Sequence, residues 1–72
     1  MTAITTIRID HDALPAEFDR SRPDIVAEVV QAALRDEGIK AEASDLFSHL
    51  KIELPTAQLA AASAVLAALK LI

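Results

Sequence analysis

The sequence predicts an α+β fold, a two-layer sandwich of β-α-β-β-α order in which two helices cover one face of a three-stranded sheet. Three observations carry this prediction. A β-branched run at 2–10 is typical of a strand. An amphipathic stretch at 21–37 is typical of a helix, and alternating residues at 39–54 then precede a second helical stretch. A crossover helix between parallel strands, followed by a helix on the same face, gives the two layers.

The first strand is expected at 2–10, where Thr and Ile dominate. The segment 11–20 has no sustained period, so we expect a loop there with one short turn around Pro15. A loop of about ten residues exceeds most strand-to-helix connections, and long loops are often functional. The alternative is that Leu14 and Phe18 fold back over one edge of the core.

The clearest helix is expected at 21–37. Ser21 is a good N-cap, and Asp24 three residues later resembles the second half of a capping box. Pro23 suits the first turn, and Gly38 is the expected C-terminal cap. The face expected to be buried consists of Ile25, Val26, Val29, Val30 and Ala33, with Leu34 at its edge.

After Gly38 the hydrophobic period changes from helical to alternating. Apolar residues at 39, 41 and 43 alternate with polar ones, and the same pattern returns at 49–54. These patterns predict two strands, each with one face on the core and one in water, joined by a turn at 44–47. The alternative for 39–43 is an extended connection.

The last helix is expected at 55–72, with Thr56 as its N-cap. It is rich in Ala and Leu, and Lys70 is its single charge. At about 100° per residue, the core stripe comprises Leu59, Ala62, Leu66 and Leu69, with Val65 and Ile72 beside it.

Roughly opposite that stripe lies a row of small residues: Ala57, Ala61, Ala64 and Ala68. Small side chains let a second helix approach closely, so we expect these four to contact a protein partner or another copy of the chain. The alternative is that alanine is present only because it is a good helix former. The helix is shorter than the roughly 20 residues of a membrane span, so we expect no membrane partner.

Composition narrows the classes of function. Residues 1–72 are expected to form a single small α/β domain, and the absence of cysteine excludes disulfides and thiolate chemistry. With no cysteine and no targeting segment, we expect a cytoplasmic location. The net charge is −4, the basic residues are scattered, and Phe18 and Phe47 are the only aromatics. Nucleic acid is therefore not expected as a partner.

Two polar features near the first loop are candidates for chemistry. The Asp10-His11-Asp12 run could bind a divalent cation or supply an acid–base pair, although extended neighbours point to opposite faces. The alternative is a solvated loop. Arg20 and Arg22 precede a helix N-terminus, where an anion is favoured, but no Gly-rich approach accompanies them.

No glycine-rich phosphate loop, nucleophile elbow or HExxH pair is present, so we assign no catalytic residue, no metal ligand and no cofactor, and we do not expect an enzyme. The sequence instead favours a small acidic protein-interaction module of the inhibitor, antitoxin, adaptor or accessory type. It would bind a protein partner or itself, as a homodimer, through the Ala-rich helix. The alternative is a dimeric ligand-binding, metal-binding or catalytic domain that uses the 10–12 loop.

Overall fold

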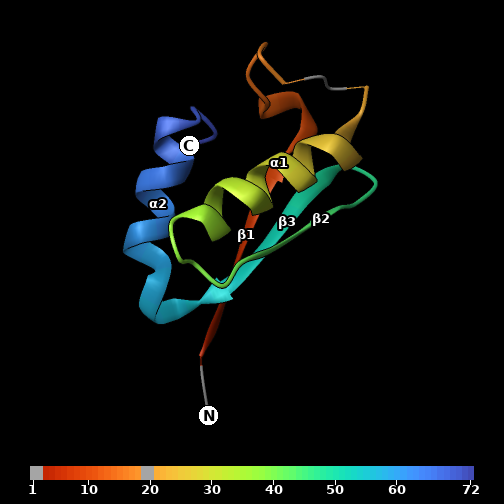
Figure 1. Ribbon diagram of the computed structural model, residues 1–72. Helices are drawn as coiled ribbons and strands as arrows, with labels where there is room; N and C mark the ends of the chain where they lie inside the picture. The colour runs from red at the N-terminus through yellow and green to blue at the C-terminus, as the bar shows by residue number, and fades with distance from the viewer. Residues whose placement is uncertain (1–2, 19–20) are drawn as a thin grey trace.

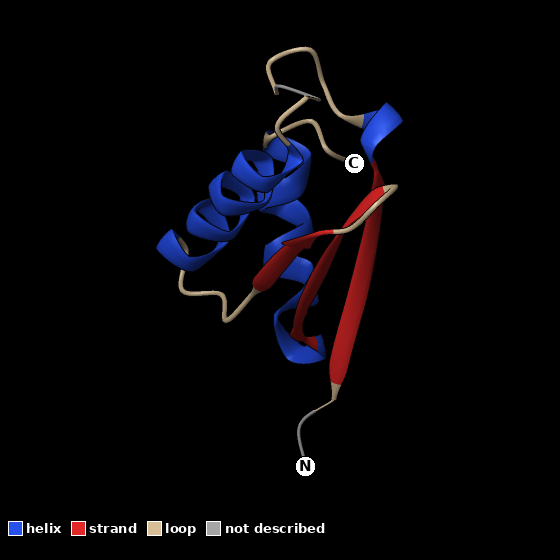
Figure 2. Cartoon of the chain, turned by 90° about the vertical axis from the view of Figure 1, so that its right-hand side faces the viewer, coloured by secondary structure: helices blue, strands red, loops and turns tan. Residues whose placement is uncertain are grey.

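The computed structural model describes residues 3–18 and 21–72, and it confirms the predicted α+β sandwich (Figure 1). Two helices cover one face of a three-stranded sheet, and the other face is open (Figure 2). The strands and α-helices are β1 (Ile4–Asp10), α1 (Pro23–Asp36), β2 (Glu42–Asp45), β3 (His49–Pro55) and α2 (Leu59–Ala68). Two short 3₁₀ turns, η1 (His11–Ala13) and η2 (Thr56–Gln58), follow β1 and β3.

The strands are ordered β1-β3-β2, and β3 is antiparallel to both neighbours. The crossover through α1 therefore joins two parallel strands that are separated by one strand. Ile52 is the centre of the register, since it pairs with Ile7 on one side and Ala43 on the other. The alternation predicted for β3 is confirmed, because Leu50, Ile52 and Leu54 are at most 1% exposed.

Helix α1 begins later and faces the core differently than predicted. Its N-cap is Arg22, which makes no side-chain capping bond, so the prediction of Ser21 as the N-cap was wrong by one residue. Proline at the first helical position drives the preceding residue out of the helical region. Ile25 and Val29 are 43% and 46% exposed, so the predicted buried face was rotated. The buried residues are Val26, Ala27, Val30 and Leu34.

Both α-helices end in the same six-residue motif. In α1, Gly38 has φ 79° and donates to the Arg35 carbonyl, while Ile39 donates to that of Leu34. This Schellman arrangement confirms the predicted cap.

In α2 the equivalent position is Lys70, with φ 61°. Lys70 N–H donates to the Ala67 carbonyl at 3.0 Å, and Leu71 N–H donates to that of Leu66 at 2.9 Å. A non-glycine residue thus occupies the left-handed position.

Strand β2 lies three residues further along the chain than predicted. Ile39 and Ala41 are buried but belong to the connection, and the turn predicted at 44–47 falls instead at 46–48. Side chains fix this connection. Gln58 accepts from Lys40 N–H and donates to the Gly38 carbonyl, at 2.9 and 3.0 Å. Gly38 and Lys40 bond to this side chain, and pairing with β3 begins at 42.

The start of α2 also differs from the prediction. Pro55 belongs to β3, and Thr56 directs its Oγ1 to Thr5 Oγ1 at 2.7 Å rather than capping the helix.

The first loop folds back over the core, which is the alternative that the sequence offered for this segment. Leu14 is 1% exposed, and the half-buried Phe18 packs against the core.

Candidate protein-interaction surface

The outer side of α2 consists of alanine. Every exposed residue between Ala57 and Leu69 is alanine, because the larger residues and Ala62 turn inward and are buried or half-buried. All four alanines of the predicted stripe are exposed. Ala60 and Ala67 widen it, and their exposure could have been inferred from the helical wheel once Ala62 was assigned to the core. The exposed alanines are Ala57, Ala60, Ala61, Ala64, Ala67 and Ala68, and we call them the alanine face.

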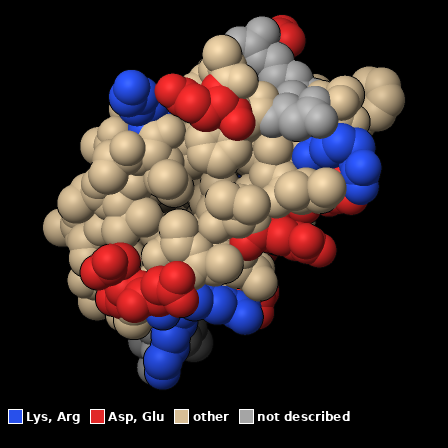
Figure 3. All heavy atoms as spheres, turned by 45° about the horizontal axis from the view of Figure 1, so that its top comes forward, with Lys and Arg blue, Asp and Glu red and all other residues tan. Residues whose placement is uncertain are grey.

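The alanine face carries no charge. No Asp, Glu, Lys or Arg occurs between Glu53 and Lys70 in the sequence. Seen from above, the two helices present a broad uncharged expanse with acidic and basic side chains at its margins (Figure 3). The absence of charge matters because a helix docked there would not have to desolvate an ion.

One end of the alanine face opens into a hollow of about 210 Å³. Glu17 and Phe18 from the first loop line it together with Ala68, Leu69 and Lys70 from the end of α2. The fold therefore brings the first loop against the end of the predicted alanine stripe. Lys70 Nζ lies 4.0 Å from Glu17 Oε1, and both side chains are mostly exposed.

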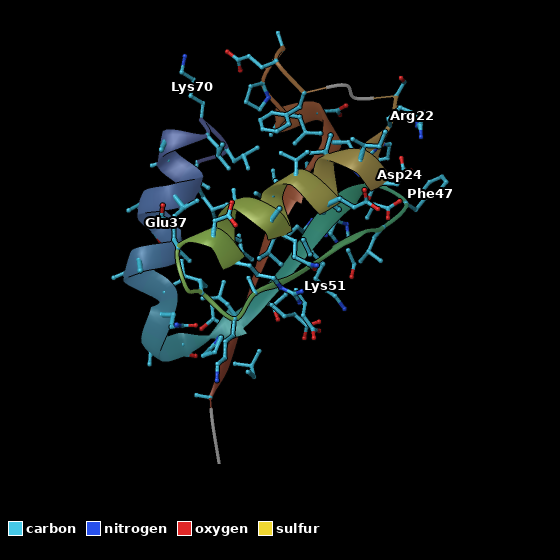
Figure 4. All side chains as sticks on the ribbon, in the orientation of Figure 1. Arg22, Asp24, Glu37, Phe47, Lys51 and Lys70 are labelled. Atoms are coloured by element: carbon cyan, nitrogen blue, oxygen red, sulfur yellow. The ribbon has the colours of Figure 1, made fainter. Side chains whose placement is uncertain are left out.

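Arg22 is separate from this surface (Figure 4). It lies at the start of α1, and its Nε is 3.5 Å from Asp24 Oδ1. The hydrogen bond from Arg22 lowers the pKa of Asp24 below its ordinary value of 3.8, and the nearby positive charge of Arg22 adds to the effect. A carboxylate of the chain itself therefore faces the cation that was predicted to attract an anion. Arg20, the other arginine of that prediction, lies outside the described residues.

The Asp10-His11-Asp12 run does not converge on one point. The Asp10 carboxylate pairs with Arg8 Nε at 2.9 Å, and Asp12 is exposed. His11 donates its backbone N–H to the Ser48 carbonyl at 3.1 Å, and its buried Nε2 has no hydrogen-bond partner in the structure. Across 3–18 and 21–72, no three His, Asp or Glu side chains are placed so that they could hold a metal ion.

Comparison of the chain with protein-family models, curated proteins and solved structures found no match. Within the part of the chain that the structure describes, neither helix has the length and apolar character that crossing a bilayer requires. Any role of the alanine face and of the adjoining hollow therefore has to be inferred from their geometry alone.

Proposed function

We propose that this chain is a small acidic protein-interaction module, of the inhibitor, antitoxin, adaptor or accessory type, which acts by binding and not by catalysis. It binds a protein partner or a second copy of itself through the alanine face, in the cytoplasm. The observation that carries the proposal is that all the exposed residues of α2 are alanine and that no charged residue occurs between Glu53 and Lys70.

Alanine suits this role for two physical reasons. A row of methyl groups lets the axis of a second helix approach to about 8 Å, the lower end of the range for packed helices. Alanine also has no side-chain rotamers to freeze, so ordering the surface on binding costs no side-chain entropy. The same methyl groups expose little apolar area, which is why the face is tolerated in the free chain.

The hollow beside Ala68 supports the proposal further. Phe18 and Leu69, both partly buried, are among the residues that line it, and its volume is large enough for an apolar side chain of a partner. Interfaces gain most of their affinity from a few anchors that fill such hollows, while surrounding contacts exclude water. The alanine face would supply those surrounding contacts.

The test replaces Ala61 and Ala64 separately by Glu, with Ser44→Glu on β2 as a matched control. All three positions are exposed, so each substitution adds the same charge without touching the core. We expect both alanine variants to lose association in light scattering across a concentration series, and Ser44→Glu to keep it. Circular dichroism checks that each variant remains folded.

Wild-type association that persists unchanged in Ala61→Glu and Ala64→Glu would remove the alanine face from the proposal. If the wild type stays monomeric at millimolar concentration, the partner is a different protein. The same three variants then separate the outcomes in a two-hybrid screen. Partners that bind Ser44→Glu but neither alanine variant support the proposal, and partners that bind all three contradict it.

A further inference from the structure

One edge of the sheet is open. Backbone bonds lie at both ends of β1, from His11 N–H to the Ser48 carbonyl at 3.1 Å and from Thr56 N–H to the Ala3 carbonyl at 2.9 Å. In an antiparallel pair the bonded residues alternate, so the odd-numbered residues of β1 bond to β3. Even-numbered residues direct their backbone groups away from the sheet, and for three of them the described chain supplies no partner. The outward residues with both groups available are Ile4, Thr6 and Arg8.

The opposite edge is partly occupied by α1. Ala43 in β2 donates its outward N–H to Gln31 Oε1 at 2.9 Å, and Arg35 Nε donates to the Ala41 carbonyl at 3.0 Å. Both partners belong to α1, so these bonds fix that helix over β2. The two edges therefore differ, because α1 already bonds to backbone groups on the β2 side, whereas nothing in the described chain occupies the outward groups of β1.

The helix layer is also wider than the sheet. Two helices side by side span roughly 20 Å. Three strands about 4.8 Å apart span only roughly 14 Å, so the difference is about one strand. Because α1 is fixed over β2, the excess falls on the other side of the sheet, and Figure 1 shows α2 on the β1 side of α1.

The burial of side chains along β1 agrees with a helix layer that is wider than the sheet. Ile9 is 4% exposed, but Thr5 and Ile7 on the same helix-facing side are only half-buried. Leu59 and Ser63 of α2 are likewise half-buried. On the fully covered strand β3, by contrast, the corresponding residues are buried completely.

We infer that the β1 edge accepts an extended segment of a partner protein as a fourth strand beneath α2. The outward groups of Ile4, Thr6 and Arg8 would form about six backbone hydrogen bonds with an antiparallel segment. The chemistry of the segment follows from its two sides. Residues facing the uncharged α2 are uncharged and preferably β-branched, and residues on the open face are polar, beside the Arg8–Asp10 pair.

A complete second copy does not fit this edge. A two-fold pairing of β1 with β1 would place two α2 helices over strands only about 4.8 Å apart, whereas packed helices need 8–10 Å. A single extended segment avoids this conflict. The inference does not depend on the alanine face, so each proposal can fail without the other.

The test uses the full chain labelled with ¹⁵N and an acetylated, amidated peptide with the sequence of residues 3–11. This peptide has the inferred chemistry, since its residues 5, 7 and 9 are uncharged. Saturating peptide is expected to slow amide hydrogen exchange at Thr6 and Arg8 by at least about tenfold. Exchange at Thr5 and Ile7, which already bond to β3, should not change.

Two modified peptides provide matched controls. N-methylation at residues 4, 6 and 8 blocks the nitrogens that would face β1 and should abolish the protection, whereas methylation at 5, 7 and 9 should preserve it. Unchanged exchange at Thr6 and Arg8 with millimolar peptide would overturn the inference. Equal effects of the two methylated peptides, or shifts confined to the alanine face, would overturn it as well.

Discussion

Replacing Lys70 by glycine should stabilise the protein, because Lys70 occupies a left-handed position with φ 61°. An L-residue with a side chain pays about 1–2 kcal/mol in that region, and glycine does not. Glycine in turn adds about 0.5–1 kcal/mol of conformational entropy to the unfolded chain. The net gain expected for Lys70→Gly is therefore about 0.5–1 kcal/mol in the free energy of unfolding.

The same motif at the end of α1 supplies the converse experiment. A Cβ added at Gly38 would meet no atom within 4 Å, so Gly38→Ala tests the backbone conformation alone. By the same balance of strain and unfolded-state entropy, it should cost about 0.5–1 kcal/mol. Lys70→Ala retains the Cβ and removes the charge, which controls for the loss of the Glu17 contact. That contact is 4.0 Å long between exposed groups and contributes little.

Thermal and urea denaturation followed by circular dichroism measure all three variants. For a chain of this length, a gain of about 0.5–1 kcal/mol corresponds to a rise in Tm of roughly 2–8 °C. Lys70→Gly should melt above the wild type, with Lys70→Ala close to it and Gly38→Ala below it. If Lys70→Gly is no more stable than Lys70→Ala, the left-handed conformation carries no strain and the reasoning fails.

Two further predictions concern polar contacts. Gln58→Ala removes the bonds to Gly38 and Lys40. It should lower the free energy of unfolding by only about 1 kcal/mol, because both backbone groups are exposed and water replaces the lost bonds. Urea denaturation measures this change, and unchanged stability would contradict the prediction. Arg22→Ala should raise the pKa of Asp24 toward 3.8, as read from an NMR titration of its carboxyl group. Because the folded-state pKa is lowered, the stabilisation by Asp24 is present above the unfolded-state pKa and is lost as the pH falls through the folded-state value. A pKa of Asp24 that is the same in both proteins would show that Arg22 is not its cause.

Local patterns were sufficient for the order of elements. The change from a helical to an alternating period after Gly38 located α1 and β3, and the glycine predicted the α1 C-terminus because only its backbone accepts φ 79° without strain. The exposure of the stripe at 57, 61, 64 and 68 also followed from periodicity. Its role in binding stays a prediction.

Other features depend on contacts between residues far apart in the chain, which local sequence patterns do not predict. The rotation of α1 that exposes Ile25 and Val29 is set by where the helix meets the sheet, since both are as apolar as the buried Val26 and Val30. The connection before β2 is bonded by Gln58, eighteen residues along the chain from Lys40, whose N–H it accepts. The first loop reaches the end of α2 only because Leu14 and Phe18 pack on the core.

The sequence by itself determined the elements, their order and the uncharged alanine helix, because periodicity and capping act within a few residues. Only the tertiary structure decided that β3 lies in the centre, that α1 covers one edge of the sheet and that β1 is left open at the other. Strand order and edge coverage are settled by hydrogen bonds and packing between segments far apart in the chain. The types of side chain in a strand do not reveal whether the backbone groups along its outer edge are bonded.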